Sequence, residues 1–536
     1  MANPSLQIGN RKWAIKEDNL LGYSKAGTRF VPQPITMTRE SAGTRVNSSG
    51  LVETVELLGS DVVINGDFDT DSNWTKGTGW SISGGSANCD GSQSGTTSLT
   101  PSLDNVVNNV TYIVEYTISN YTSGSISIKL GNTGYGAVRT ANGTYTEEIK
   151  AQATTFPRSQ INADSIFVGS IDNVSVKEST KNNLARVDYD GTASSLLVEP
   201  ERTNLITYSE DFENSGWGTY NSTLEADSVI SPNGILNATK LIGTNDVTAH
   251  TLYTNAYTVV SGVDYTHSVF IKKSQSKYVQ LYTGNGYGNY YANFNLEDGV
   301  VETFTTLDAN IENIGGGWYK CSTKANSSTT TAQSTVALID SATSGRGYAF
   351  NAENESVYIW GAQIEEGSYA TSYIPTSGST VTRVQDQYSK AGISNLINSE
   401  EGVLFLEIAA LSDDGTNRLF QINDSTTSNM ITLGYTPVSN QLLVEIRSGG
   451  GSIDDLTHTI TDVLLYNKIA LKWKENDVAL WVNGVEVGII PTVTMPIGLN
   501  KLVFDYNGIL HFYGKVKQLQ VFKTALTDTE LATLTT

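Results

Sequence analysis

The chain has 536 residues, more than one hydrophobic core ordinarily serves, and this length predicts about three or four domains. It carries 34 Lys and Arg against 55 Asp and Glu, a net charge of −21, which should repel phosphate backbones and disfavours nucleic acid as a partner. Only 17% of the residues are charged, and long stretches are rich in Ser, Thr, Asn and Gly. That composition is typical of solvated β-surfaces and turns, and it favours neutral, hydroxyl-rich ligands.

Targeting signals and disulfides are not predicted. Residues 1–20 lack the apolar region of a secretion signal, and nowhere do eighteen apolar residues run together. We therefore expect a protein made in a cytoplasm, with no membrane insertion. Cys89 and Cys321 fall in different predicted domains, so we interpret both as buried free thiols.

Alternation of apolar and polar residues predicts short antiparallel strands along the chain, most clearly over 112–118, 125–130 and 478–482. Asn483-Gly484 between two alternating runs is a strong hairpin signal. A helix is indicated only at the end, where Thr527 can cap a turn. The predicted fold class is all-β, with several jelly-roll or β-sandwich domains in tandem.

Three landmarks recur in the same order in residues 61–178 and 204–374, which indicates an internal repeat. The first is a Phe-acidic turn followed by Trp, the second an alternating run, and the third a closing strand. They occupy 65–74, 110–116 and 165–174 in one copy, and 209–217, 263–270 and 356–364 in the other. These landmarks resemble the jelly roll of carbohydrate-binding modules.

The last segment has a different signature. Its alternating runs are followed by a Leu- and Thr-rich tail, and the runs and the tail cover 403–408, 468–473, 478–487, 514–522 and 525–531. This pattern resembles a concanavalin A-like, laminin-G-like domain.

Residues 41–53 and 185–206 resemble two halves of one passage of tailed-bacteriophage virion proteins, and the phrases at 360–367, 371–376 and 381–383 resemble the same proteins. In those proteins the two halves run nearly together, so here a jelly roll is predicted to be inserted into the N-terminal segment. The predicted domains are an N-terminal virion-attachment segment 1–60, a jelly roll 61–180, a linker 181–203 that continues the first segment, a second jelly roll 204–385 and the laminin-G-like sandwich 386–536.

No catalytic constellation is visible in the sequence. His250, His267, His458 and His511 have no recognisable partner spacing, and structural or surface roles are favoured for them. Nucleophile-elbow, zinc-helix, phosphate-loop and Cys-x-x-Cys motifs are absent. Glycosidases of the concanavalin type place two carboxylates on one strand face, whereas the runs around Glu407 and Glu445 each carry a single acid. We therefore predict a protein that is not an enzyme.

A ligand site is predicted where aromatic rings and amides gather in a Gly-rich stretch, because sugars present both C–H faces and hydroxyls. Residues 282–291 supply Tyr282, Asn285, Tyr287, Asn289, Tyr290 and Tyr291. The alternatives are tyrosines packed against strands, or subunit contacts. A second candidate is Tyr135, with Asn132 and Arg139. The tryptophans of the landmarks and apolar runs are predicted to be core residues, namely Trp74, Trp217, Trp360, Trp473 and Trp481.

A structural calcium is a further possibility implied by the resemblance to carbohydrate-binding jelly rolls, although no cofactor is required. Asp69 and Asp172 match the opening and closing positions, with an exposed turn and a strand end as the alternative. In the second copy the closing position is taken as Gln363, which argues against a second calcium. Asp413-Asp414-Gly415 is interpreted as a solvated turn rather than a metal rim.

The resemblances together imply a non-catalytic bacteriophage head-fibre, tail-fibre or appendage protein on the virion surface, which attaches to host glycans or receptors. By analogy it would dock on other virion proteins through its N-terminal segment and form a homotrimer. Two alternatives stay open. One is a glycan-degrading depolymerase with accessory binding modules, and the other is a purely structural capsid or tail decoration protein.

Overall fold

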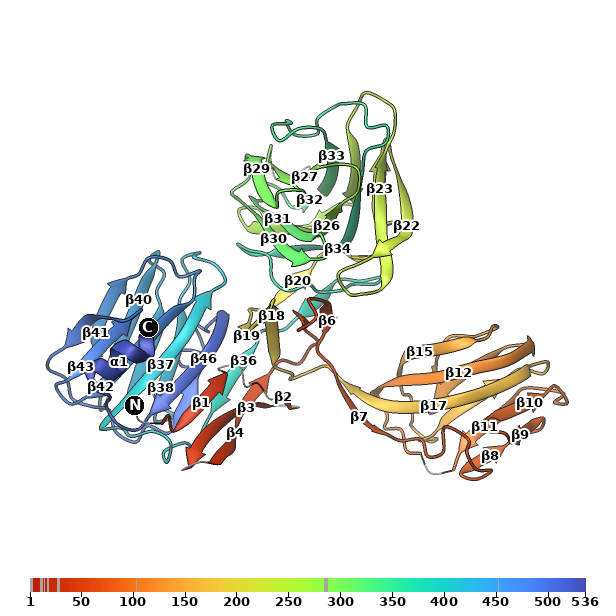
Figure 1. Cartoon of the computed structure of the whole chain (residues 1–536), viewed down its shortest axis with the longest axis horizontal. Coiled ribbons are helices and arrows are strands. Elements are labelled where there is room, and N and C mark those ends of the chain that lie inside the picture. The colour runs from red at the N-terminus through yellow and green to blue at the C-terminus, as the bar shows by residue number, and fades with distance from the viewer. Residues whose placement is uncertain are drawn as a thin grey trace. The chain divides into compact units, whose positions relative to one another are not determined.

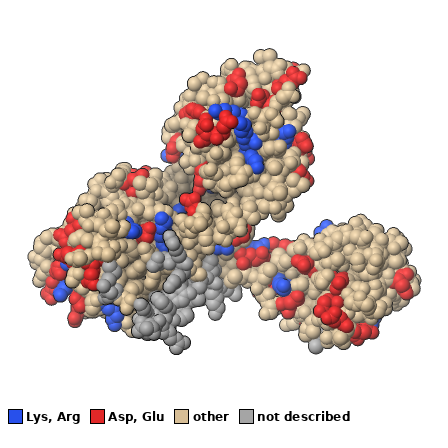
Figure 2. Space-filling model, in the orientation of Figure 1, with Lys and Arg blue, Asp and Glu red and all other residues tan. Residues whose placement is uncertain are grey.

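The computed structural model describes residues 3–536 except 10–12, 14, 17–18, 27–28, 103, 284–287 and 452. The described chain forms 46 strands and one short helix, which confirms the all-β prediction. It divides into two compact units, residues 56–181 and residues 1–55 together with 182–536 (Figure 1). No described helix has the length and apolar character needed to cross a membrane. On the face seen in Figure 2, Asp and Glu are scattered over the chain, and Lys and Arg gather in one stripe on the second jelly roll beside a group of acidic residues.

The unit 56–181 is a jelly roll of two antiparallel sheets around one core. One sheet has the order β9 (Trp80–Ile82), β10 (Ala87–Asp90), β17 (Val168–Thr180), β12 (Thr111–Ser123) and β15 (Gly143–Lys150), with β7 (Leu57–Asp61) pairing to β17. The other has the order β8 (Trp74–Lys76), β11 (Thr97–Pro101), β16 (Ser159–Ala163), β13 (Ile126–Leu130) and β14 (Gly134–Tyr135).

The second jelly roll repeats this strand order and adds one strand at the edge of each sheet. Its first sheet runs β22 (Ser222–Ile230), β23 (Leu236–Gly243), β34 (Ser356–Glu366), β26 (Asp264–Lys273), β31 (Trp318–Asn326) and β30 (Asp308–Gly315). Its second sheet runs β21 (Trp217–Tyr220), β24 (His250–Thr254), β33 (Ser334–Ile339), β27 (Tyr278–Thr283), β28 (Tyr291–Asn295) and β29 (Val300–Phe304). Two short pairs, β25 (Tyr257–Thr258) with β32 (Thr331–Ala332) and β20 (Arg202–Asn204) with β35 (Val381–Arg383), complete it.

Individual hydrogen bonds recur in the two copies and confirm the internal repeat. Trp74 Nε1 donates to the carbonyl nine residues earlier at 2.8 Å, and Trp217 Nε1 does the same at 2.8 Å. The hydroxyl of Tyr112 accepts the backbone N–H five residues earlier at 2.9 Å, and the hydroxyl of Tyr265 does so at 3.0 Å. The five predicted core tryptophans and both free cysteines are buried, as expected.

The C-terminal domain is a β-sandwich that the N-terminal strands complete. One side runs β46 (Gly514–Phe522), β37 (Glu401–Ala410), β42 (Asn467–Lys474), β43 (Val478–Val482) and β44 (Val485–Ile490). The other runs β36 (Gln387–Lys390), β45 (Lys501–Val503), β38 (Arg418–Asn423), β39 (Met430–Tyr435), β40 (Gln441–Arg447) and β41 (Ile453–Thr459). The strands β1 (Leu6–Gly9), β2 (Ile15–Lys16), β3 (Asn19–Ala26) and β4 (Arg29–Thr38) link the two, because β1 pairs with β46 and β4 with β36.

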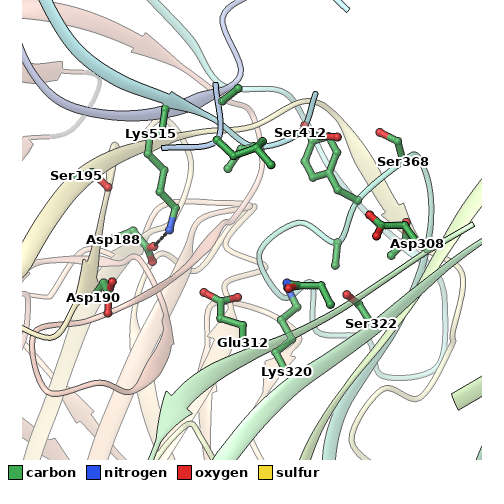
Figure 3. A pocket seen from close by; sticks show the side chains of 18 of the residues that line it. Asp188, Asp190, Ser195, Asp308, Glu312, Lys320, Ser322, Ser368, Ser412 and Lys515 are labelled. Atoms are coloured by element: carbon green, nitrogen blue, oxygen red, sulfur yellow. Dashed lines mark ion pairs between the residues drawn. The ribbon is translucent and has the colours of Figure 1, made fainter. Parts of the chain in front are cut away.

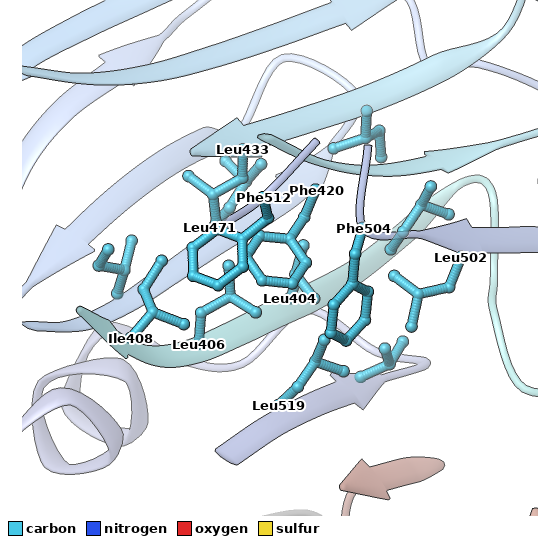
Figure 4. Close-up of a cluster of buried hydrophobic side chains, with 14 of the residues drawn as sticks. Leu404, Leu406, Ile408, Phe420, Leu433, Leu471, Leu502, Phe504, Phe512 and Leu519 are labelled. Carbon is cyan, nitrogen blue, oxygen red and sulfur yellow. The ribbon is translucent and has the colours of Figure 1, made fainter. Parts of the chain in front are cut away.

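The core of this sandwich is aliphatic and aromatic. Phe420 lies between Phe504 and Phe512, with ring centroids 4.7 and 4.3 Å away, and leucines of several strands surround them (Figure 4). The predicted hairpin is present: Asn483 and Gly484 have φ of 48° and 89°, the left-handed values that a two-residue turn requires. The predicted cap is also present, since Thr527 and Glu530 form a capping box on α1 (Asp528–Thr535).

The segments on either side of the inserted jelly roll meet in one buried polar junction. Hairpin β5 (Thr44–Val46) and β6 (Val52–Thr54) lies against β18 (Arg186–Asp190), which pairs with β19 (Ala193–Val198). Arg186 donates to Thr44 O at 3.2 Å, and Arg39 N–H donates to Asn183 Oδ1 at 2.7 Å. The two separated passages therefore form one substructure.

Candidate functional site

A row of tyrosines crosses the outer face of one sheet of the second jelly roll. Val279 and Leu281 of β27 point into the core, so the alternate residue Tyr282 points outward. In the register of the sheet, Tyr282 lies opposite Tyr291 on one side and Thr335 on the other, and Thr335 lies opposite Tyr253. We call Tyr253, Thr335, Tyr282 and Tyr291 the tyrosine row. Neighbouring strands lie about 4.8 Å apart, so the row spans about 14 Å.

Arg346 lies over the centre of this row. Its guanidinium carbon is 4.5 Å from the centroid of the Tyr282 ring, and its Nη2 donates to Thr283 O at 3.0 Å. Among the described residues, Nε of Arg346 has no hydrogen-bond partner. Burial raises the pKa of Tyr282, so its hydroxyl stays protonated and can both donate and accept hydrogen bonds.

The floor beside the row is a buried amide network. Gln280 Nε2 donates to Asn293 Oδ1 at 2.7 Å, and Asn293 Nδ2 donates to Ser344 O at 2.8 Å. Gln280 also accepts the backbone N–H of Gly347 at 2.9 Å. These bonds fix the segment that carries Arg346 onto the sheet.

Tyr253 is positioned by a glycine. A Cβ atom added to Gly218, its neighbour on β21, would lie 2.7 Å from the Tyr253 ring. The ring therefore lies directly over the backbone of β21, which only a residue without a side chain permits. The sequence did not predict Tyr253 and Arg346 as site residues, because they lie about 30 and 60 positions from Tyr282 in the Gly-rich stretch where the ligand site was predicted.

The structure places the predicted residues of 282–291 in different settings. Tyr282 and Tyr291 belong to the row. Asn289 is exposed, and its carbonyl accepts the Thr305 hydroxyl at 2.9 Å. Tyr290 is half-buried against a small apolar cluster, as the alternative interpretation has it. Asn285 and Tyr287 lie outside the described residues, and their role stays a prediction.

Tyr135 of the first jelly roll occupies the position equivalent to Tyr291. It lies opposite Lys129 on β13, and Lys129 lies opposite Gln160, which donates to Thr100 Oγ1 at 3.3 Å. Tyr135 is 62% exposed. Lys129 and Thr100 of the first jelly roll thus stand where the second has Tyr282 and Tyr253, so the equivalent row is mainly polar. Two other predicted neighbours have structural roles, because Asn132 accepts the backbone N–H of Thr155 and Arg139 pairs with Glu147 at 3.4 Å.

The calcium prediction is not supported by a third ligand. Asp69 is exposed, and Asp172 accepts the backbone N–H of Asn173 at 2.6 Å. Among the described residues no group of three His, Cys, Asp or Glu side chains could hold a metal ion. The calcium site therefore stays a prediction.

One equivalence drawn from sequence is wrong. Asp172 lies opposite Thr117, just before a bulge in β17, and Trp360 lies opposite Phe270, just before the equivalent bulge in β34. Asn173 and Gly361, which follow, both have left-handed φ, of 52° and 60°. The counterpart of Asp172 is therefore the buried Trp360 and not Gln363, because the register of each closing strand is set by its pairing with β12 or β26, which matching the strand sequences alone does not show.

The other titratable groups are mostly structural. The ring nitrogens of His250 bond to Asn221 O and Phe350 O at 2.6 and 2.9 Å. Burial lowers the pKa of His267 to about 3. Asp414 pairs with Arg418 at 2.7 Å and accepts the Ser368 hydroxyl at 2.7 Å, so its carboxylate is bonded within the protein.

One acidic pair was missed in the sequence. Glu445 of β40 lies directly opposite Asp455 of β41. Burial, and then the charge of Asp455, raise the pKa of Glu445. Its sequence signal was weak, because the two acids lie on neighbouring strands rather than on one.

Comparisons with known proteins give distant likenesses only. No protein-family model matches the chain, and no curated protein sequence matches it. A CBM40 module of Ruminococcus gnavus IT-sialidase, bound to α2,3-sialyllactose, is 19% identical over 27% of this chain and 86% of its own, with a TM-score of 0.24. The CBM22-1–CBM22-2 tandem of Paenibacillus barcinonensis Xyn10C is 12% identical over 58% and 98%, with a TM-score of 0.22. Trypanosoma rangeli sialidase is 9% identical over 93% and 98%, with a TM-score of 0.23.

Proposed function

We propose that the protein is a non-catalytic adhesion protein that binds host-surface glycans through the tyrosine row. The row itself carries the proposal. The tyrosine rings can pack against the C–H faces of sugars on the outside of the sheet, while Arg346 and the tyrosine hydroxyls offer hydrogen bonds. A span of about 14 Å suits several sugar rings better than one.

The proposal places the protein on the surface of a bacteriophage virion, as a fibre or appendage. This part rests on the resemblance of 41–53 and 185–206 to virion proteins. In the structure those passages form the buried junction. A need to fold this junction, as well as a need to assemble on the virion, would explain why similar passages occur in virion proteins. Docking on other virion proteins, trimer formation and the laminin-G-like character of the C-terminal sandwich belong to the same proposal.

A glycan array with bacterial surface polysaccharides tests the adhesion. The purified chain should bind at least one polysaccharide, and Tyr282→Ala and Tyr291→Ala should each weaken binding about fivefold, since an aromatic contact contributes on the order of 1 kcal/mol. Tyr358→Ala is the matched control, because Tyr358 lies on the opposite sheet with Lys240 above its ring. Blank arrays, or an equal loss in the control, would refute the adhesion proposal.

The depolymerase alternative has one specific observation in its favour, the Glu445–Asp455 pair. A carboxyl with a raised pKa beside a second carboxylate is the arrangement that glycoside hydrolysis uses. Incubation with the polysaccharides that bind, followed by an assay for new reducing ends, separates the two functions. Sustained release that Glu445→Gln abolishes would make the protein an enzyme. If arrays are blank and virions lacking the protein still adsorb normally, the decoration role is favoured instead.

A further inference from the structure

A hollow of about 690 Å³ lies between the second jelly roll and the C-terminal sandwich, within the same compact unit (Figure 3). Its walls come from β18 and β19, from β30 and β31, from residues 368–370 and from the ends of β37 and β46. Ligand sites in proteins commonly have volumes of about 300–1,000 Å³. The hollow therefore has the size of a binding site, and it uses the sheet opposite the tyrosine row.

The formal charges that line the hollow cancel. Four Asp or Glu residues and four Lys residues contribute to the walls, together with several serine and threonine hydroxyls. Figure 3 shows Asp190 and Asp308 on opposite sides, with Glu312 and Lys320 between them. An ion of either sign would thus meet groups of its own sign across the hollow.

Three lysines of the hollow already form ion pairs, whereas three of its carboxylates do not. Lys515 pairs with Asp188 at 3.3 Å, and the lysines at 324 and 517 pair with carboxylates outside the hollow at 3.6 and 3.8 Å. Among the described residues, Asp190, Asp308 and Glu312 form no ion pair within 4.0 Å. Asp308 Oδ1 accepts the backbone N–H of Ala309 at 2.9 Å, and the other carboxylate oxygens are acceptors to which a ligand's hydroxyls can donate.

Donors face the same space. Lys320 lines the hollow with its stem buried and its Nζ bonded to Thr371 O. Although burial opposes its charge, Asp188 and Glu312 raise the pKa of Lys515, so this ammonium remains a donor at neutral pH. Tyr466 and Leu464 add apolar surface beside these groups.

We propose that this hollow is a second carbohydrate site, which binds a neutral, hydroxyl-rich oligosaccharide and contacts both domains at once. Each sugar hydroxyl donates one hydrogen bond and accepts others, so it can serve the carboxylates and the ammonium groups together without adding charge. The site is separate from the tyrosine row, and it stands whether or not the row binds a glycan.

Calorimetric titration of the full chain tests the proposal, with maltohexaose, cellohexaose and chitohexaose as probes. The protein titrated is the double variant Tyr282→Ala with Tyr291→Ala, so that the tyrosine row contributes nothing to the measured binding. At least one probe should bind, and Asn310→Trp, at an exposed position of β30 that lines the hollow, should weaken it at least about tenfold. Ser83→Trp, exposed in the unit 56–181, is the control and should leave binding unchanged.

A second variant guards against misfolding by the added tryptophan. Asp308→Asn with Glu312→Gln keeps the shape of the hollow and removes two acceptor charges, and it should weaken binding at least about fivefold. The proposal is overturned if no probe binds the tyrosine-row variant, or if binding persists unchanged in both hollow variants. If the tyrosine substitutions alone abolish binding, the tyrosine row is the binding site and the proposal for the hollow is overturned. If binding survives these substitutions and is lost with Asn310→Trp, the hollow is the binding site.

Discussion

Arg39 Nη1 lies 2.7 Å from Asp386 Oδ1, although the two residues are 347 positions apart and neither side chain is exposed. Asp386 also pairs with Arg186, and Glu199 pairs with Arg186 and Arg383. Burial opposes these charges, but Asp386 and Glu199 raise the pKa of Arg186 above its usual value. The junction thus joins three distant stretches of the chain through charges that are paired inside the protein.

Breaking this junction should destabilise the unit that contains it. Asp386→Ala leaves Arg39 and part of Arg186 as buried, unpaired charges, and we expect a loss of about 3–5 kcal/mol in the free energy of unfolding. Glu53→Ala removes the partly exposed pair with Arg45 and should cost about 1 kcal/mol or less. Urea unfolding followed by tryptophan fluorescence measures both, and equal losses would contradict the argument.

His267 should make the second jelly roll sensitive to acid. Burial lowers its pKa from 6.5 to about 3, and its ring nitrogens have no hydrogen-bond partner in the described structure. Between these two values the unfolded state binds a proton that the folded state does not, so stability falls as the pH falls, by up to about 1.4 kcal/mol per pH unit.

The comparison with His267→Leu isolates this contribution, because other carboxylates titrate equally in both proteins. Unfolding free energies measured from pH 7 to pH 4 should decline less steeply in the variant. Parallel curves would show that His267 is not the group that responds.

The sequence was a good guide wherever a local pattern decides the structure. The Phe-Trp landmarks, the Asn483-Gly484 turn and the Thr527 cap each depend on residues a few positions apart, and each was confirmed. The predictions that were wrong or incomplete concern features that depend on pairing between distant strands. The pairing of β34 with β26 makes Trp360 rather than Gln363 the counterpart of Asp172, and sheet order brought Tyr253 and Arg346 to Tyr282.

The unit 56–181 should be removable. Leu57 lies opposite Thr180 in the β7–β17 pairing, so the chain enters and leaves this unit at neighbouring points. Replacing 57–180 with a short Gly-Ser linker should change the free energy of unfolding of the remaining chain by no more than about 1 kcal/mol, because the closed loop is short. Residues 56–181 expressed alone should unfold in one cooperative transition. A remaining chain that lacks cooperative unfolding would refute the insertion.

Gly218 should matter to ligand binding more than to folding. In Gly218→Ala the new Cβ would lie 2.7 Å from the Tyr253 ring, which must swing away and leave the end of the tyrosine row. Because the side chain can move, we expect a stability change of about 1 kcal/mol or less, but a loss of affinity of about fivefold for a glycan that binds the row. Gly95→Ala is the control, since its Cβ would meet no atom within 4 Å. Calorimetric titration and thermal unfolding of both variants measure the two quantities, and an affinity unchanged in Gly218→Ala would remove Tyr253 from the site.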